Sequence, residues 1–401
     1  MAQLDEARTI SDTVAAHVAD HNQLHAKANY VFDVTDFGAT GDGATDDTAA
    51  IQAAIDACET AGGGTVLMPT GDYRITAQLT VPTLTNIVGM GTGLHSGSGG
   101  TRILPETTSQ AVFKIGALVR FVSIKDMSIV AASDSIGIVG VLLEAAAADG
   151  QSDHLVISGV HFYRIDKGIY ANSTTGEWSF TNVRIDNCKW DEIDTACIHM
   201  NSQNFDSWRI SNCALGTFVD GLYLEASGFL TVFAMFGSAA SAPGVSAFVR
   251  IEQKAGPLTM IQCQAETIDH HVIISGGSSF AAPLTLISNV VNAPITVDEN
   301  WVVNLIGNLF TAAVTGSATD AQVLALGNSG ATYSLGGNNR NTIFDLYDIG
   351  ISLDVPVIGF YGATPAVKPT VTGARDDGTA LADLLTELAT LGLLTDSSTA
   401  T

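Results

Sequence analysis

Ile185-Asp186-Asn187-Cys188 and Ile210-Ser211-Asn212-Cys213 are two copies of a short motif that decides the fold. The motif occurs eight times, and its first residues are Ile124, Ile157, Ile185, Ile210, Val232, Ile261, Ile287 and Ile306. These anchors are 19 to 33 residues apart, and periods of roughly 20–50 residues are typical of stacked repeats, in which one repeat alone cannot bury its apolar face. Each repeat alternates polar and apolar residues without a helical pattern, and its third position holds mostly turn-forming residue types. The pattern therefore predicts an all-β solenoid with one coil per motif.

The composition suits such a fold and excludes several partners. The 401 residues are 46% apolar and 14% charged, with 40 glycines and 10 prolines, as expected for many short strands in a single elongated domain. The net charge of −24, with only 17 Lys and Arg residues, argues against nucleic acid and anionic membranes as partners. We expect no membrane insertion, because no apolar run approaches the ~20 residues of a membrane span. Met1 is not followed by a signal-peptide pattern, which predicts synthesis in the cytoplasm and any later export by another route.

The five cysteines lack the spacing of a metal site, and their odd number argues against a disulfide framework. Cys188 and Cys213 hold the same place in successive motifs, directly after the asparagine. We expect both to stack inside the solenoid, because free cysteine packs as a small apolar side chain.

Residues 1–29 carry a helical pattern with a narrow apolar stripe at spacings of three and four residues. A helix this short is marginal alone, so we expect it to associate with copies of itself or with a docking protein. His17, His21 and His25 lie four residues apart on it. Metal binding across a symmetry axis is one interpretation, and polar layers that set the helix register are the favoured one.

Residues 30–120 are predicted to form the N-terminal region of the solenoid, with a capping helix over residues 46–60. One apolar face of this helix consists of residues at helical spacing, Ile51, Ala54, Ile55 and Cys58. We expect the helix to shield the open edge of the first coil, which would otherwise be a template for aggregation.

A dense set of motif residues lies between residues 31 and 75: Asp36-Phe37-Gly38-Ala39, Gly41-Asp42-Gly43, Asp46-Asp47-Thr48, Gly63-Gly64-Thr65-Val66, Pro69, Gly71 and Tyr73. These residues resemble the N-terminal signature of pectate-lyase-like right-handed parallel β-helix proteins, many of which are bacteriophage tailspikes and polysaccharide depolymerases. Nearer the two ends, His17-Val18-Ala19-Asp20-His21 and Phe360-Tyr361-Gly362-Ala363 resemble minor tail proteins of phages that infect actinobacteria.

The resemblance implies a right-handed, single-stranded parallel β-helix with short N- and C-terminal helices, assembled as a homotrimer on a phage tail. It assigns residues 1–29 to trimerisation and to attachment to a tail or baseplate protein. The β-helix then begins over residues 30–120 and continues in coils over residues 121–343. Residues 344–401 are expected to form a small C-terminal module with a terminal helix. A host cell-wall or capsular polysaccharide is the implied partner.

Four aspartates follow their coil anchors at similar distances and are the first candidates for chemistry: Asp166, Asp194, Asp220 and Asp269. Because coils stack about 4.8 Å apart, aligned carboxylates repel one another, and at least one pKa should rise. Carboxyl groups about 5–5.5 Å apart suit retaining glycoside hydrolysis, and a separation of about 6.5–9.5 Å suits inversion. A lyase instead needs a base beside a uronic-acid carbon and a cation for its carboxylate. A ladder of turn-forming aspartates is the favoured alternative, and calcium binding is another.

We take Asp166, Asp194, Asp220 and Glu225 as candidate catalytic residues, with no metal site and no cofactor except calcium as an alternative. The candidate sugar-binding residues are aromatic and cationic side chains in the same coils, namely Trp178, Trp190, Trp208, Tyr223 and Arg209. Aromatic rings pack on the C–H face of a sugar while carboxylates accept hydrogen bonds from its hydroxyls. The alternative is that these rings pack against loops or a neighbouring subunit.

His270 and His271 belong to a further group of acids and bases with Glu266 and Asp269. Neighbouring residues on a strand point to opposite faces, so at most one of the two histidines can join a site.

Two functions are consistent with the sequence. The protein recognises a glycan on the host cell surface and depolymerises it by hydrolysis or elimination, or it is a structural or receptor-binding tail protein without enzymatic activity. No motif defines a catalytic set, and the fold alone does not decide between these functions.

Overall fold

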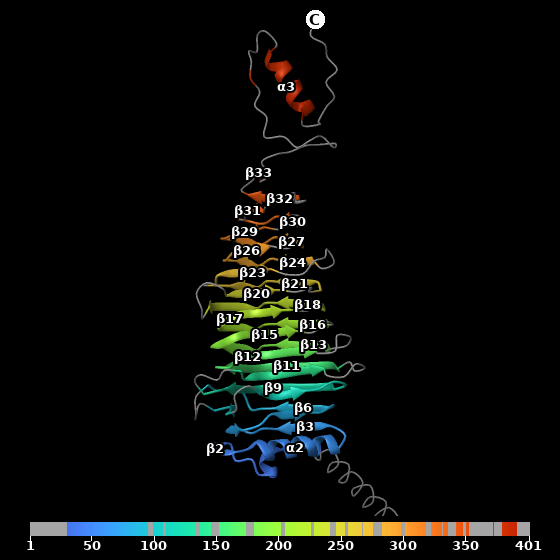
Figure 1. Ribbon diagram of the computed structural model, residues 1–401, viewed down its shortest axis with the longest axis vertical. Coiled ribbons are helices and arrows are strands. Elements are labelled where there is room, and N and C mark those ends of the chain that lie inside the picture. The colour runs from blue at the N-terminus through green and yellow to red at the C-terminus, as the bar shows by residue number, and fades with distance from the viewer. Residues whose placement is uncertain are drawn as a thin grey trace, which may run out of the picture.

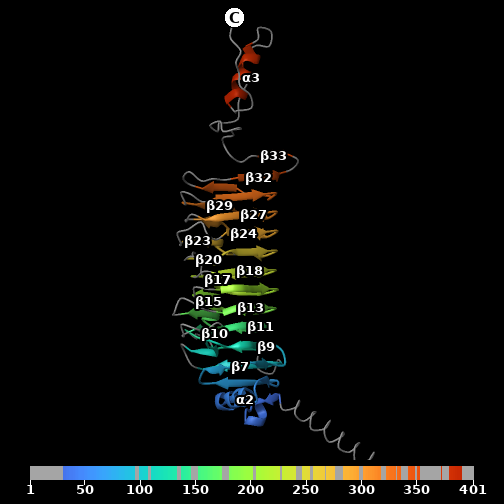
Figure 2. The same cartoon turned by 90° about the vertical axis from the view of Figure 1, so that its right-hand side faces the viewer.

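The computed structural model describes residues 30–94, 99–106, 110–132, 137–145, 152–173, 180–201, 205–225, 228–240, 246–252, 256–266, 268–275, 283–297, 301–317, 322–330, 332–335, 342–347, 350–352, 372 and 379–390. The attachment helix predicted for residues 1–29 lies outside this part of the chain, as does Trp178. The strands stack one above another into a long column and run across its axis (Figures 1 and 2).

Three stacks of parallel strands form the sides of this column. The first stack consists of β1 (Val31–Asp33), β3 (Gly64–Leu67), β6 (Thr85–Val88), β9 (Arg120–Val130), β11 (Ser152–Tyr163), β13 (Phe180–Asp186), β16 (Phe205–Ser211), β18 (Gly228–Phe233), β21 (Leu258–Ile261), β24 (Pro283–Ile287), β27 (Val302–Ile306), β30 (Gln322–Leu326) and β32 (Thr342–Tyr347). The second stack includes the C-terminal parts of β9 and β11 together with β2 (Asp42–Asp46), β4 (Gly71–Ile75), β7 (Thr101–Pro105), β14 (Lys189–Asp191), β17 (Ala214–Leu224), β19 (Phe236–Ala240), β22 (Gln264–Ala265), β25 (Val290–Val291) and β28 (Leu309–Phe310).

The third stack includes the C-terminal part of β17 together with β5 (Leu79–Val81), β8 (Ala111–Ile115), β10 (Val139–Ala145), β12 (Lys167–Ser173), β15 (Ile193–Asn201), β20 (Ala247–Ile251), β23 (His270–Ile274), β26 (Ile295–Val297), β29 (Ala313–Gly316) and β31 (Thr332–Leu335). At the C-terminal end of the first stack, β33 (Gly350–Ser352) pairs antiparallel with β32. The all-β solenoid predicted from the repeats is therefore confirmed as a parallel β-helix.

The repeat motif marks the inside of the column in the first coils. Ile157 pairs with Ile185, which pairs with Ile210, and all three side chains are buried. The last three anchors, Ile261, Ile287 and Ile306, are shifted by one residue relative to the earlier anchors. Val232 pairs with Met260 and not with Ile261. A shift of one residue turns every side chain of a strand to the opposite face. The inward positions of the later coils are thus Met260, Leu286 and Leu305.

One residue in the left-handed conformation makes the corner between the first and second stacks in each of these coils. The corner residues, with φ between 50° and 64°, are Asp126, Gly159, Asn187, Asn212, Ala234, Gln262, Ser288, Gly307 and Gly327. The turn predicted at the third motif position is therefore confirmed as far as Ala234. In the last three motifs the corner lies at the second motif position, because the register of these coils is shifted by one residue.

The residue after the corner points inward and changes in character along the column. Cys188 and Cys213 occupy this position as buried neighbouring thiols, as predicted. Further along, Asn289, Asn308 and Asn328 occupy it and are each 1% exposed. The Nδ2 group of Asn289 donates to Oδ1 of Asn308 (3.0 Å), and Nδ2 of Asn308 donates to Oδ1 of Asn328 (2.9 Å). Such a ladder satisfies polar groups that are costly to bury unpaired.

Helix α2 (Thr48–Thr60) packs against β1, β3 and β5 and covers the open first coil (Figure 1). Its buried face consists of the four residues predicted for it, Ile51, Ala54, Ile55 and Cys58, and the helix begins two residues later than the predicted range of 46–60. A short 3-10 helix, η1 (Val34–Phe37), precedes it, and α3 (Thr379–Thr390) lies where a terminal helix is predicted. Within the described ranges, no helix has the length and apolar character needed to span a membrane.

Candidate functional site

The outward face of the third stack carries a column of stacked rings. Tyr170 on β12 pairs in register with His199 on β15, which pairs with Tyr223 on β17. We call these three side chains the ring column. They point outward because alternate residues such as Ile198 and Met200 face the core. The strand spacing of about 4.8 Å places the rings face to face, with centroids 4.8 Å and 4.4 Å apart.

Two glutamates lie beside the ring column and meet at one hydroxyl group. Oη of Tyr223 is 3.1 Å from Oε1 of Glu225 and 2.7 Å from Oε2 of Glu252, so these two carboxylate oxygens are at most about 5.8 Å apart. A hydroxyl group has a single proton and can donate to only one of them. The hydroxyl group of Tyr223 thus bridges the two carboxyl groups, and the three side chains form one hydrogen-bonded cluster.

The neighbouring imidazole extends this cluster. Nε2 of His199 is 2.7 Å from Oε2 of Glu225, while Nδ1 is buried and has no hydrogen-bond partner among the described residues. Burial lowers the pKa of His199, and Glu225 partly opposes that effect. We therefore assign a neutral ring with its proton on Nε2, donated to Glu225. Burial, followed by the two glutamates, raises the pKa of Tyr223, so its phenol is also neutral at ordinary pH.

Asp220 positions a cation next to the cluster. Its carboxylate is 5% exposed, and Oδ2 accepts a hydrogen bond from Nε of Arg250 at 2.8 Å. Burial raises the pKa of Asp220, while Arg250 opposes the increase. Nη1 of Arg250 is 3.9 Å from Oε1 of Glu252. The carboxylates of Asp220 and Glu252 thus both lie at one guanidinium group, and with Glu225 nearby the site has an excess of negative charge.

The predicted row of aspartates does not align in the structure. Asp166 lies next to Thr195 of the following coil. Its backbone carbonyl accepts a hydrogen bond from the backbone N–H of Thr195, and its carboxylate accepts one from the hydroxyl of Thr195. Asp220 instead lies in register with Ala196 and Ala247. Asp269 accepts hydrogen bonds from the backbone and hydroxyl of Ser246 in the preceding coil.

Two of the predicted catalytic residues lie outside the Tyr223 cluster, although Asp166 lies beside the ring column. Asp166 forms an ion pair with Lys167 at 2.8 Å, and Nζ of Lys167 lies 5.5 Å from the ring centroid of Tyr170. Asp194 is exposed near the start of β15. Of the four candidates, the structure brings Asp220 and Glu225 together around Tyr223 and Arg250.

The two described tryptophans of the predicted sugar surface are core residues. Trp190 is 0% exposed and stacks on Phe162 with centroids 5.4 Å apart. Trp208 is 1% exposed, and its Nε1 donates to the carbonyl of Phe180 at 2.7 Å. Neither ring has a face open to a sugar, because each occupies an inward strand position. Arg209 is exposed on the first stack, next to Arg184 and away from the ring column.

Sequence reasoning did not assign Tyr170, His199, Arg250 or Glu252 to the site. A signal for the ring column was present, because Tyr170, His199 and Tyr223 follow the anchors of their coils by 13, 14 and 13 residues. Arg250 and Glu252 carry a weaker signal, since a longer connection separates them from their anchor, Val232. Within the described part of the chain, no three His, Cys, Asp or Glu residues converge as a metal site.

Comparison with known proteins agrees with the fold. Residues 31–114 match the family described as rhamnogalacturonase A/epimerase, pectate lyase-like. DFA-IIIase from Arthrobacter chlorophenolicus A6 without its lid superposes with a TM-score of 0.62 at 14% identity, over 80% of this chain and 95% of that chain. At that identity the likeness concerns the fold alone. The chain thus contains a parallel β-helix whose N-terminal part, residues 31–114, is pectate lyase-like.

Similar sequences cover limited parts of the chain. Mannuronan C5-epimerase AlgE3 of Azotobacter vinelandii is 56% identical over 69 residues, which are 16% of this chain and 4% of that protein. The capsule K30/K69-specific depolymerase of Klebsiella phage K64-1 is 26% identical over 196 residues, which are 47% of this chain and 24% of that protein. The matched parts are therefore short relative to both of these proteins.

Proposed function

We propose that this protein is a phage tail protein that binds a bacterial cell-surface glycan at the ring column. The observation that carries this proposal is the outward column of Tyr170, His199 and Tyr223, with Glu225 and Glu252 beside it. Because the rings stack face to face and His199 is 7% exposed, their outer edges supply the apolar surface for sugar C–H groups. The carboxylates accept hydrogen bonds from sugar hydroxyls. The similarity to a capsule-specific phage depolymerase and to mannuronan epimerases supports a carbohydrate polymer as the ligand.

A direct binding measurement tests this function. Wild-type protein, Tyr170→Ala and Thr259→Ala should be compared on immobilised bacterial capsule, wall and exopolysaccharides. Thr259 is a matched control, because it points outward on the first stack. We expect Tyr170→Ala to lower the affinity for the bound polymer by about 10-fold, the equivalent of about 1.4 kcal/mol of lost ring contact. Equal affinities for the two variants would refute a role for the ring column.

A position on the virion as a trimer belongs to the same proposal. Residues 1–29 would attach the β-helix to the tail and hold three copies together, as the likeness of the chain to phage proteins suggests. Light scattering from the full-length protein should then give the mass of three chains. The mass of a single chain would contradict this assembly.

Hydrolysis of the bound glycan is the second candidate function, and the cluster at Tyr223 specifically favours it. Two carboxylate oxygens at most about 5.8 Å apart are closer to the retaining separation of about 5–5.5 Å than to the inverting one. One carboxyl group would protonate the leaving oxygen while the other attacks the anomeric carbon. Water, deprotonated by the first group, would then release the bound sugar and restore both groups.

The products of the reaction separate the alternatives. Hydrolysis produces new reducing ends without the ultraviolet absorbance of an unsaturated sugar. Elimination produces both signals, and an intact polymer means that the protein binds without cutting. We expect retaining hydrolysis at the Tyr223 cluster, in which the new reducing ends first appear with the anomeric configuration of the substrate.

A further inference from the structure

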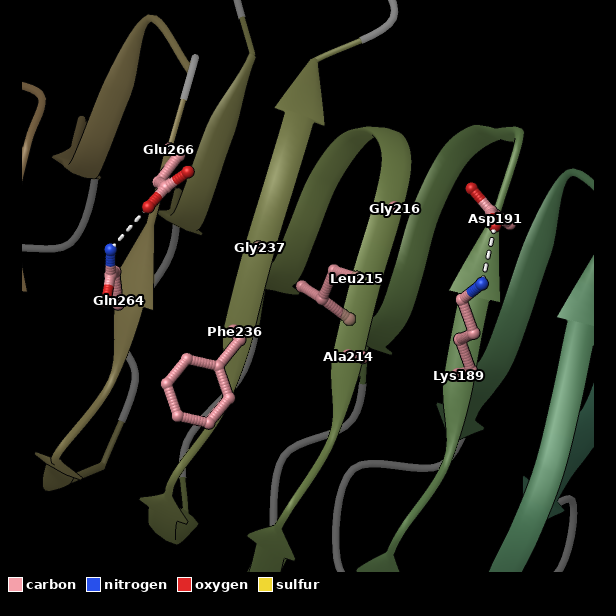
Figure 3. Close-up of a pocket in the computed structure, with 9 residues that line it drawn as sticks. All are labelled: Lys189, Asp191, Ala214, Leu215, Gly216, Phe236, Gly237, Gln264 and Glu266. Atoms are coloured by element: carbon pink, nitrogen blue, oxygen red, sulfur yellow. Dashed lines mark hydrogen bonds and ion pairs between the residues drawn. The ribbon is translucent and has the colours of Figure 1, made fainter.

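A groove lies on the second stack, on a different face of the β-helix from the ring column. It has a volume of about 340 Å³, at the lower end of the ~300–1,000 Å³ typical of ligand pockets. Lys189 and Asp191 lie at one end, and Gln264 and Glu266 lie at the other, with the ring of Phe236 between them (Figure 3).

Small side chains on β17 create the hollow. In register along the column, Lys189 is followed by Ala214, then by Phe236 and Gln264. The short side chain of Ala214 therefore leaves a gap between two longer neighbours. Gly216 makes room for the carboxylate of Asp191 at the edge of this gap, since a Cβ atom at Gly216 would lie 2.0 Å from Oδ1 of Asp191.

The polar groups of the groove are held in place by local interactions. Nζ of Lys189 is 3.0 Å from Oδ2 of Asp191, and Oδ1 of Asp191 accepts a hydrogen bond from the backbone of Thr217. At the opposite end, Nε2 of Gln264 donates to Oε1 of Glu266 at 2.6 Å. Three strand spacings of about 4.8 Å separate these ends by about 14 Å along the column axis.

Phe236 gives the groove an apolar surface. Its ring is 51% exposed, although large apolar side chains are usually buried. An exposed ring between fixed hydrogen-bonding groups matches the alternating C–H and hydroxyl surfaces of a sugar chain.

The charge of the groove selects among glycans. The only cation in its lining, Lys189, is already neutralised by Asp191, and Glu266 leaves a net formal charge of −1. The whole chain has a net charge of −24. A polymer of uronic acids carries one negative charge on each sugar and would meet repulsion here. Uncharged sugars and protonated amino sugars meet none.

We propose that this groove is a binding subsite for uncharged or amino-sugar glycans, and that it discriminates against polyuronates. The inference rests on the proposed glycan-binding function and specifies its ligand class. It distinguishes this chain from the alginate epimerases, whose names describe the polymannuronate on which they act.

Calorimetry with the full-length protein tests the subsite. The probes are chitosan tetramer, chitotetraose, cellotetraose, maltotetraose and tetramannuronate, together with any polysaccharide that the wild-type protein binds. Ala214→Trp should fill the groove and reduce binding at least 10-fold, a loss of about 1.4 kcal/mol. Because Ala214 is exposed, the larger side chain does not crowd the core. Thr259→Trp, an outward substitution on the first stack, should bind as the wild type does.

A charge variant tests the ligand class separately. Glu266→Lys changes the formal charge of the lining from −1 to +1, so it should gain affinity for tetramannuronate, most strongly at low salt. Wild-type protein should bind an uncharged or amino-sugar tetramer more tightly than tetramannuronate.

The outcomes separate this inference from the proposed function. Wild-type binding that survives Ala214→Trp overturns the subsite and leaves glycan binding intact. Tighter wild-type binding to tetramannuronate than to every other probe overturns the ligand class. Failure of the wild-type protein to bind any probe or polysaccharide overturns the proposed function itself.

Discussion

The hydroxyl group of Tyr223 lies between two glutamates, and the imidazole of His199 completes the cluster. Each strand supplies only one or two of these groups. Their proximity depends on the register of β15, β17 and β20, which places residues far apart in sequence at neighbouring positions. Glu225 was predicted from its local sequence, whereas Glu252 required knowledge of that register.

Removing either charge at the cluster should separate catalysis from binding. We expect Glu225→Gln and Glu252→Gln each to lower the rate of glycan hydrolysis by about 10²–10⁴-fold, the usual contribution of a catalytic acid or base. Both variants should still bind the polymer, because the ring column remains. Reducing-end assays and calorimetry provide the two measurements. Wild-type rates in both variants would exclude the pair from catalysis.

His271 makes stability depend on pH. Its ring is fully buried next to Phe248 and has no hydrogen-bond partner among the described residues, and burial lowers its pKa to about 4. The unfolded chain, with an ordinary pKa of about 6.5, takes up a proton as the pH falls below that value, while the folded chain does not. Stability attributable to His271 is therefore complete above about pH 6.5 and is lost towards pH 4. His270, its neighbour, points to the other face, as predicted.

Substitution of His271 tests this pH dependence. Between about pH 6.5 and pH 5, the wild type should lose about 2 kcal/mol through this group, at about 1.4 kcal/mol per pH unit. His271→Leu should lose correspondingly less. Urea unfolding at both pH values gives these free energies. An equal loss in His271→Leu and wild type would show that His271 has no such role.

At the scale of the element, the asparagine ladder stabilises the coils between β21 and β30. Oδ1 of Asn308 accepts a hydrogen bond from the backbone N–H of Asn289 at 2.8 Å, and its Nδ2 donates to the carbonyl of Leu286 at 3.0 Å. Removing the amide leaves both backbone groups buried without a partner, which costs about 1–3 kcal/mol for each.

We expect Asn308→Leu to lower the free energy of unfolding by about 3 kcal/mol, since a buried leucine satisfies neither group. Asn304 is the matched control, because it lies on β27 but points outward. Asn304→Ala should cost less than about 1 kcal/mol. Chemical denaturation measures both variants. Similar losses would show that the interior amide contributes nothing specific.

The corner at Ala234 is a second test at this scale. Ala234 adopts φ of 50°, a conformation that is strained for alanine and accessible to glycine. Ala234→Gly should therefore raise the free energy of unfolding by roughly 0.5–1 kcal/mol, after allowing for the extra entropy of glycine in the unfolded chain. A destabilised variant in the same denaturation experiment would contradict the strain assigned to this corner.

At the scale of the whole molecule, periodicity was sufficient to predict a β-solenoid, whereas the parallel β-helix followed from the family resemblance and the capping helix from its helical spacing. Periodicity did not give the strand register of the later coils, because Ile261 and Met260 are both apolar and either can serve as the anchor. It also misplaced the tryptophans, since composition does not show which face of a strand Trp190 or Trp208 occupies. The ring column could be predicted in part from its spacing, but the pairing of Asp220 with Arg250 depends on the conformation of long side chains.

The central claim is that glycans bind on the outward face of the third stack. The most direct test is a structure of the protein with an oligosaccharide from the polymer that it binds. We predict that sugar rings contact Tyr170 and Tyr223, with their hydroxyls donating to Glu225 or Glu252. An oligosaccharide bound only at Arg184 and Arg209 on the first stack, with the ring column unoccupied, would contradict the account.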